Sequence, residues 1–453
     1  MKPREPVDDG RQDLFRARLD QIIDMKHPKV VLARAIDWDW LAEEIGAVYK
    51  DGRGYPPLPV RLMAGLHILK YMDDLSDEEV CRRFVENPYY QYFCGEVFFR
   101  HELPFDRSSL TRWRQRLGEE KVMALLQASL MAAVRLGAAR PSDFTRVIVD
   151  TTVQEKNITH PTDAKLMDTA RRRLARLAKT HGVRLRQSYA RVGKRALIKH
   201  QRYRHAKQYK RANREKRRLS TYLGRVIRDI RRKIAGNTEL GDIFRAELWK
   251  AERVRTQKPR DGIPKKIYSL HAPEVECIGK GKAHKPWEFG VKVSVATPWR
   301  RSKGGQFVAH VKALPGRPYD GHTLRTVLPE IEKFTGAALE RVYVDDGYRG
   351  HGLGTRYKFK VFTSSQKRGV TKAIRRELRR RAAVEPVIGH LKASHRMGRN
   401  YLAHALGDAV NAVLAAAGYN FRLLINWIIT ILLALLKLAC ATRRISSLHA
   451  KGI

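Results

Sequence analysis

Hydrophobic positions in the first part of the chain recur with the period of a helix. Residues 61–75, RLMAGLHILKYMDDL, carry apolar side chains at three- and four-residue spacing, which is typical of a helix with a buried face. Ser76 and Glu79 follow as a capping-box pattern at the start of another helix. The pattern therefore predicts a mostly helical domain over residues 1–140.

A more basic helix is predicted near the end of this domain. In SLTRWRQRLGEE, residues 109–120, Arg112 and Arg114 flank Trp113. Such a helix could enter a DNA groove, although basic amphipathic helices are more often solvated surface helices. Arg112 and Arg114 are the candidates for DNA contact in this domain, which we expect to recognise DNA ends.

The pattern changes at residue 146, where RVIVDTT has the short β-branched run of a buried central strand. A strongly basic stretch follows over residues 165–233, and few acids offset it. Apolar residues recur in it at helical spacing, at Leu174, Leu177, Leu219, Leu223, Val226 and Ile230. We expect a helical hairpin with a wide cationic surface, within an insertion over residues 165–265.

Strand patterns resume after the insertion and then alternate with helical ones. Three runs rich in Val, Ile and aromatic residues indicate a meander, at 267–279, 287–298 and 305–316. A helix is predicted next, at 322–334. Two further strands, at 341–350 and 358–365, and a long helical region from about residue 371 follow. This order predicts an α/β domain with a mixed sheet flanked by helices. It comprises residues 141–164 and 266–420, on either side of the insertion.

The last part of the chain, residues 421–453, begins with an apolar segment. FRLLINWIITILLALLKLAC approaches the length of a membrane span, but Arg422, Asn426 and Lys437 interrupt it. A buried or partner-facing helix is therefore favoured over a membrane segment.

The charge balance points to a polyanionic partner. The chain has 90 Lys and Arg against 46 Asp and Glu, for a formal net charge of +44. Such an excess favours nucleic acid over an acidic membrane surface. The four cysteines are widely spaced, without a C-x-x-C pair, so neither a disulfide framework nor a zinc site is expected and a reducing cytoplasm is.

Two aspartates stand at equivalent places in two predicted strands. VIV precedes Asp150 and VYV precedes Asp345. If the strands are parallel neighbours, both carboxylates lie at one rim of the sheet. Their repulsion there favours a divalent cation between them. Asp346 is the alternative to Asp345.

A third carboxylate is expected from a helix beside this rim. Arg381, Glu385 and Lys392 share one helix face. Such spacing is more often a structural ion-pair ladder, but here it also fits a metal ligand with two phosphate-binding cations. Pro386 predicts a kink or a helix start next to Glu385.

An ordered set of motifs resembles IS5-type insertion-sequence transposases with a DDE catalytic core over nearly the whole chain. The segments that carry the resemblance are LFRARLDQIIDMKHP, NPYYQYFCGEVFFRHELPFDRSSLTRWRQRLGEE, VDTTVQEKNITHPTDAKL, HKPWEFGVKVSVAT, LPGRPYDGHTL, YVDDGYRGHG, SSQKRGVTKAIRRELRRRAAVEPVIGHLK and LGDAVNAVLAAAGYNFRLL.

The resemblance implies an RNase H-like core in which Asp150, Asp345 and Glu385 are catalytic and hold two Mg²⁺ ions, for which Mn²⁺ substitutes. It also implies phosphate binding by Arg381 and Lys392. A Tyr found in related transposases three residues before that Arg is replaced here by Leu378.

Two residues after the second aspartate are further candidates for DNA contact. Tyr348 and Arg349 lie in a GYRG turn that must face the same rim.

The expected activity is metal-dependent cleavage and joining of an insertion sequence in double-stranded DNA, without a small-molecule substrate. A homo-oligomer, most simply a dimer, is expected in the bacterial cytoplasm because two DNA ends must be joined. The alternatives are a catalytically inactive DNA-binding protein and a nuclease of the same fold that does not transfer strands.

Overall fold

The computed structural model describes residues 17–46, 58–258, 266–279 and 285–449. The chain divides into two compact units. The first is Met1–Glu155 with Val291–Ile453, and the second is Lys156–Gly290. The second unit is thus an insertion into the first, and it is longer at both ends than the predicted 165–265.

The front of the first unit is helical, as predicted. Its helices are α1 (Leu19–Ile22), α2 (Pro28–Ala35), α3 (Trp38–Gly46), α4 (Val60–Met72), α5 (Asp77–Glu86), α6 (Pro88–Phe93) and α7 (Ser108–Arg135).

Local sequence sets two features of these helices. The Ser76 hydroxyl accepts a hydrogen bond from the Glu79 backbone N–H at 3.0 Å and caps α5. Gly118 has φ 71° and kinks α7, which separates the predicted basic helix from the apolar half that follows.

A mixed sheet forms the centre of the first unit. Its strands are ordered β3-β1-β5-β6, and β4 pairs with β3. β5 is parallel to both β1 and β6, whereas β3 and β4 are antiparallel. The strands are β1 (Arg146–Glu155), β3 (Trp287–Pro298), β4 (His310–Leu314), β5 (Arg341–Val344) and β6 (Val361–Thr363).

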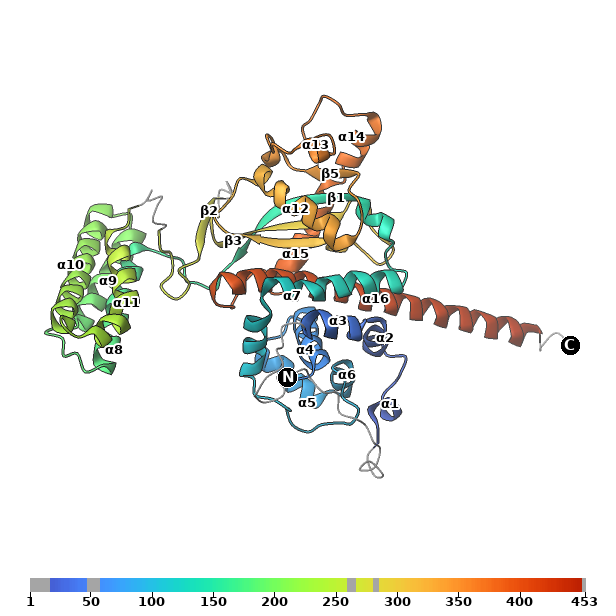
Figure 1. The fold of residues 1–453 in the computed structure, drawn as a ribbon, viewed down its shortest axis with the longest axis horizontal. Helices are drawn as coiled ribbons and strands as arrows, with labels where there is room; N and C mark the ends of the chain where they lie inside the picture. The colour runs from blue at the N-terminus through green and yellow to red at the C-terminus, as the bar shows by residue number, and fades with distance from the viewer. Residues whose placement is uncertain (1–16, 47–57, 259–265, 280–284, 450–453) are drawn as a thin grey trace. The chain divides into compact units, whose positions relative to one another are not determined.

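Helices cover both faces of this sheet. On one face Val147 and Val342 pack with apolar residues of α12 (Asp320–Thr335). On the other, Ile148 and Tyr343 join the core formed with α7 and α16 (His404–His449). Figure 1 shows α7 and α16 side by side along this face. The mixed α/β class predicted from the sequence is confirmed.

The apolar C-terminal segment belongs to α16, and its two halves differ. Phe421, Leu424 and Ile428 are buried in the core, whereas Leu433 and Leu436 are exposed. By length and composition alone, residues 404–438 of α16 are long and apolar enough to span a membrane. The expected burial therefore holds only for the first half of the segment.

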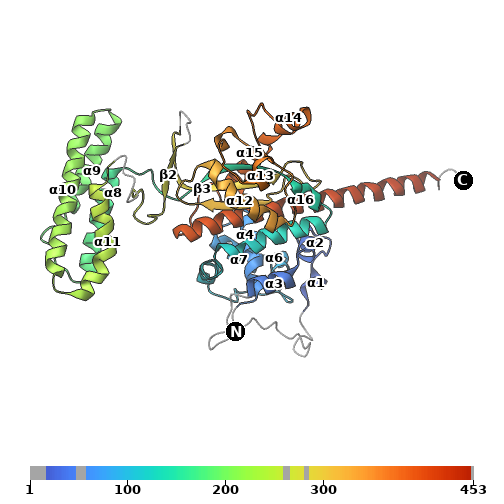
Figure 2. The ribbon, with the colours of Figure 1, turned by 45° about the horizontal axis from the view of Figure 1, so that its top comes forward.

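The second unit contains four helices in its described part, where a hairpin was predicted. They are α8 (Asp163–Thr180), α9 (Ala190–His205), α10 (Tyr209–Ile234) and α11 (Thr238–Thr256). The prediction was wrong because a hairpin leaves much of the apolar face of each helix uncovered. α9 and α11 complete the core, which includes Leu174, Leu223 and Phe244. Figure 2 shows the four helices packed together.

Two predicted strands are shorter than their sequence pattern. In the 267–279 run, only β2 (Glu276–Gly279) is a strand, and it pairs with the start of β3. Pro273 lies in the part that does not pair, consistent with its missing N–H donor. In the 305–316 run only His310–Leu314 forms a strand with β3, and Gly305 makes an isolated bridge with Ser302.

Candidate active site

The parallel pairing of β1 and β5 brings the two aspartates together. Arg146 pairs with Arg341, and Ile148 with Tyr343. The same register places Asp150 opposite Asp345, at the carboxyl end of β5. This is the rim where open α/β sheets form their binding sites.

A single arginine joins these aspartates to the glutamate. The Arg381 guanidinium lies 4.0 Å from an Asp150 carboxylate oxygen, 3.7 Å from Asp345 and 3.4 Å from Glu385. The Arg381 side chain is 19% exposed, whereas those of Asp345 and Glu385 are 51% and 61% exposed. The structure therefore gathers all three predicted acids around one cation, open to solvent on one side.

The segment that carries Arg381 and Glu385 changes its helical form at this point. Arg381 opens a short 3₁₀ turn, Arg381–Ala383, and α15 (Val384–Ser394) follows directly. Pro386 falls in the first turn of α15, where its missing N–H costs no helical hydrogen bond. The local start expected from Pro386 is thus present.

A buried carboxylate, Glu377, fixes this segment against the sheet. It pairs with Arg146 at 3.0 Å and with Arg341 at 2.8 Å, and it accepts a hydrogen bond from the Tyr343 hydroxyl. Its backbone carbonyl accepts a hydrogen bond from the Trp299 indole at 2.9 Å. Glu377 was not predicted from the sequence, because its partners lie on strands far away in the chain.

The geometry favours Asp345 over Asp346 as the second site acid. The Asp346 carboxylate accepts a hydrogen bond from the Ser365 backbone N–H at 2.9 Å and lies 3.6 Å from Arg349. Its hydrogen bonds with Ser365 lower the pKa of Asp346. Asp346 thus holds the loop after β6, while Asp345 faces Arg381.

Tyr348 lies beneath the site and is not available to DNA. Its ring is buried in the apolar cluster beside α12, and its hydroxyl faces Thr151 without closing a well-formed hydrogen bond. Burial, together with the nearby Asp150 charge, raises the pKa of Tyr348 well above its ordinary value. The expected DNA contact is wrong for Tyr348, whereas Arg349 is exposed.

A fourth acid near the site was not singled out by sequence reasoning. Asp320, in the first turn of α12, accepts hydrogen bonds from the Thr151 hydroxyl and the Lys292 ammonium, both at 2.9 Å. It ties α12 to β1 and β3 next to Asp150. The PYDGHTL segment was the signal that could have identified it.

The remaining candidates are scattered. Lys392 lies on α15, seven residues after Glu385, and is half-buried. Arg112 is exposed on α7. Arg114 is buried instead, and its guanidinium pairs with both Asp77 carboxylate oxygens at 2.9 and 2.7 Å. DNA contact by Arg114 is therefore a wrong prediction, since alternation in the sequence did not reveal which arginine faces the core.

The donor set at the rim suits a hard divalent cation, and Arg381 already provides a positive charge among the carboxylates. In the part of the chain that the structure describes, no three His, Cys, Asp or Glu side chains are spaced to hold one metal ion. In this structure the three acids thus surround the Arg381 guanidinium, and they do not form a closed coordination shell for a metal ion.

Comparison with known proteins identifies the family. Residues 17–116 match a family described as "Transposase domain (DUF772)". The "uncharacterized protein ORF8 in nfe locus" of Rhizobium meliloti is 51% identical over 209 residues, which are 46% of this chain and 100% of that protein. No solved structure matches the chain. From the matched domain and this relative, the chain belongs to the transposase family that carries the DUF772 domain.

Proposed function

We propose that this protein is a DDE transposase with an RNase H-like core that cleaves and joins the ends of an IS5-type insertion sequence. The observation that carries the proposal is the convergence of Asp150, Asp345 and Glu385 on Arg381. Asp150 lies within β1, Asp345 directly follows the parallel strand β5, and Glu385 lies in the first turn of α15. This arrangement supports a phosphoryl-transfer site more than a structural ion-pair ladder.

Asp150, Asp345 and Glu385 would hold two Mg²⁺ ions, or Mn²⁺ in their place. When bound, such ions stabilise the charge on the attacking and leaving oxygens of an in-line displacement.

The cations around this rim supply the positioning of DNA. Arg381 has the planar guanidinium that grips a phosphate through two hydrogen bonds, and Lys392 acts as a point charge. Exposed Arg349, in the turn after Asp345, and Arg112 on α7 are further phosphate contacts in this proposal.

The proposed reaction has two displacements at phosphorus. In the first, a water oxygen bonds to the scissile phosphorus and the 3′ oxygen of the element's end leaves as a hydroxyl. In the second, that hydroxyl attacks a phosphodiester of target DNA, and a target 3′ hydroxyl leaves. Both displacements exchange one P–O bond for another, so one site serves both.

Calorimetric titration with Mn²⁺ tests the site directly. The parent protein is expected to bind the ion, whereas an Asp150→Asn, Glu385→Gln variant of equal thermal stability is not. Equal binding by both, or none by either in the presence of DNA, would overturn the proposed metal site.

A second assay distinguishes the activities. With a duplex that carries the sequence flanking this gene, joined products are expected together with cleaved ones. Cleavage without joining would indicate a nuclease, and binding without cleavage would indicate an inactive DNA-binding protein.

We also propose that the protein acts as a dimer in the bacterial cytoplasm, on DNA. The exposed leucines in the second half of α16 support a contact between copies. An unchanged sedimentation coefficient in an Ile429→Glu, Leu433→Glu variant would contradict this role of α16.

A further inference from the structure

The second unit separates its charges by burial. α10 carries eleven Lys and Arg and only two acids, Glu215 and Asp229. Both acids are buried. Acids pair with some of these basic side chains, as Glu252 does with Arg231 at 3.8 Å and Asp163 with Lys216 at 3.4 Å. The outward face of α10 nevertheless keeps a large excess of basic side chains, which is unusual for a helix whose charges only provide solubility.

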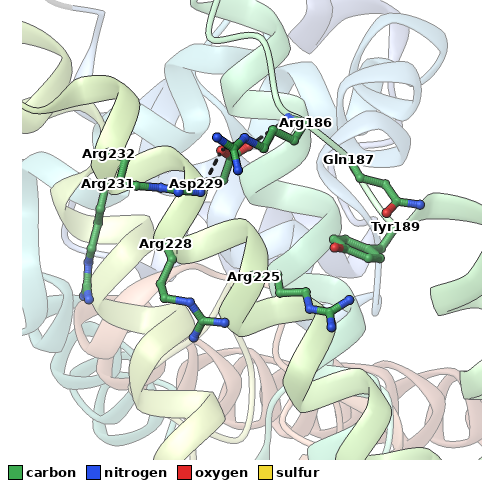
Figure 3. A pocket seen from close by; sticks show the side chains of 8 residues that line it. All are labelled: Arg186, Gln187, Tyr189, Arg225, Arg228, Asp229, Arg231 and Arg232. Atoms are coloured by element: carbon green, nitrogen blue, oxygen red, sulfur yellow. Dashed lines mark hydrogen bonds and ion pairs between the residues drawn. The ribbon is translucent and has the colours of Figure 1, made fainter.

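Part of this face is hollowed into a pocket. The pocket has a volume of about 500 Å³ and is formed by α10 together with the segment before α9. Its lining is almost entirely cationic or aromatic, with Arg186, Gln187, Tyr189, Arg225, Arg228, Asp229, Arg231 and Arg232. Figure 3 shows Arg225 and Arg228 extending from α10, with the Tyr189 ring near Arg225.

Asp229 builds one wall of the pocket. Its carboxylate accepts a hydrogen bond from the Arg186 backbone N–H at 2.8 Å, and it pairs with Lys233 at 3.2 Å and Arg232 at 3.4 Å. These interactions hold the segment before α9 against α10. The charge of Asp229, the single acid that lines the pocket, is thereby balanced by Arg232 and Lys233.

Stacking orders the other wall. Tyr189 stacks on Tyr222 with ring centroids 4.9 Å apart, and the Arg225 guanidinium lies 5.9 Å from the Tyr189 ring centre. One face of Tyr189 is therefore covered by Tyr222. Arg225 is held by a neutral partner and keeps its full charge for an anion.

Arg225 and Arg228 are the uncompensated charges here. Both are exposed, and within the described residues no carboxylate pairs with either of them. Their separation of three residues places them on neighbouring turns of α10. Two guanidinium groups from positions three residues apart on a helix match the repeating charge of a phosphodiester chain.

We propose that this pocket binds adjacent backbone phosphates of duplex DNA, through Arg225 and Arg228. The choice of DNA as the source of these phosphates rests on the proposed function. Both arginines are exposed on a strongly basic helix, and this favours a continuous backbone over a free nucleotide. The site lies wholly in the second unit and requires neither the catalytic acids nor a metal.

The test measures binding of the full chain to a labelled random-sequence duplex by fluorescence anisotropy, in EDTA, at several salt concentrations. Arg225→Gln, Arg228→Gln is compared with Arg195→Gln, Arg202→Gln, which removes the same charge from exposed positions of α9. The first variant is expected to bind about tenfold more weakly at 0.1 M salt, with a log–log salt slope smaller by about 2. The control is expected to change the slope much less.

Equal losses in the two variants would overturn the proposal, because they would show diffuse attraction rather than a site. No loss in the first variant would overturn it as well. Tripolyphosphate that binds to the parent through Arg225 and Arg228, while duplex binding is unaffected by their substitution, would instead show a small-anion site. Since EDTA removes the metal, these results are independent of the Mn²⁺ titration that tests the catalytic proposal.

Discussion

Two acid–arginine clusters of the first unit lie close together in the chain and are built in opposite ways. At Glu377, one buried carboxylate is shared by Arg146 and Arg341. At Arg381, one guanidinium is shared by three carboxylates, and two of these are more than half exposed.

In the first cluster the carboxylate is buried and fully paired, while Arg146 and Arg341 are 37% and 32% exposed. This cluster therefore stabilises the position of the segment. The second cluster has three carboxylates for one guanidinium and is open to water. Its carboxylates can therefore bind a further cation from solution. The same pair of residue types thus makes a scaffold or a site, depending on burial and on which partner is in excess.

Neutralising one exposed acid of the Arg381 cluster is expected to give the largest difference between the roles of the two clusters. Asp345→Asn is expected to lower strand cleavage at least a thousandfold, on the order of the loss when an essential catalytic group is removed. Its thermal stability should stay within about 0.5 kcal/mol of the parent, because an exposed member of a like-charged set is lost. Cleavage assays and thermal unfolding measure the two effects. A large loss of stability would assign Asp345 to the scaffold.

The reverse result is expected at the buried cluster. Glu377→Ala removes the carboxylate that Arg146, Arg341 and the buried Tyr343 hydroxyl share, and it should cost about 1–3 kcal/mol of unfolding free energy, measured by urea denaturation. Glu340→Ala is the matched control, since it removes a 54%-exposed partner of the same Arg146 and should cost less than about 1 kcal/mol. Similar costs for both variants would contradict a special role of burial.

Replacing Arg381 tests how its guanidinium affects metal binding by the three acids around it. Arg381→Gln should bind Mn²⁺ several-fold more tightly, since a competing cation is lost, yet cleave DNA about a hundredfold more slowly. Arg379→Gln, two residues away and exposed, is the control. Weaker Mn²⁺ binding in Arg381→Gln would indicate that the guanidinium organises the acids rather than competing for them.

A third, buried network extends the comparison to pH. His67 lies beside Arg114 at 3.2 Å, and burial lowers the pKa of His67 to about 3. The unfolded chain therefore binds a proton near pH 6.5 that the folded protein does not bind until about pH 3, so stability falls as the pH falls through that window.

Between pH 7 and pH 5 this effect amounts to about 2 kcal/mol. Urea denaturation at the two pH values should show the loss in the parent and a smaller one in His67→Gln. An identical pH dependence in both proteins would exclude His67 as its source.

Local pattern was sufficient where one element explains its own residues. Short apolar runs located β1 and β5 and the acids Asp150 and Asp345, and the Ser76 cap marked the start of α5. The local pattern was insufficient for Arg114 and Tyr348. Neither helical periodicity nor a turn motif shows which polar side chain is buried by an element from a distant part of the chain. Asp77 and the α12 cluster decided those positions.

The sequence by itself determined the α/β class, the basic insertion and the positions of Asp150, Asp345 and Glu385, since each follows from periodicity, charge or motif order. Only the tertiary structure decided that Arg381 lies among the three acids, that Glu377 holds their segment on the sheet, and that Arg225 and Arg228 border a pocket. These features join residues of separate elements, and their energies depend on burial and distance, which no single segment of the chain specifies.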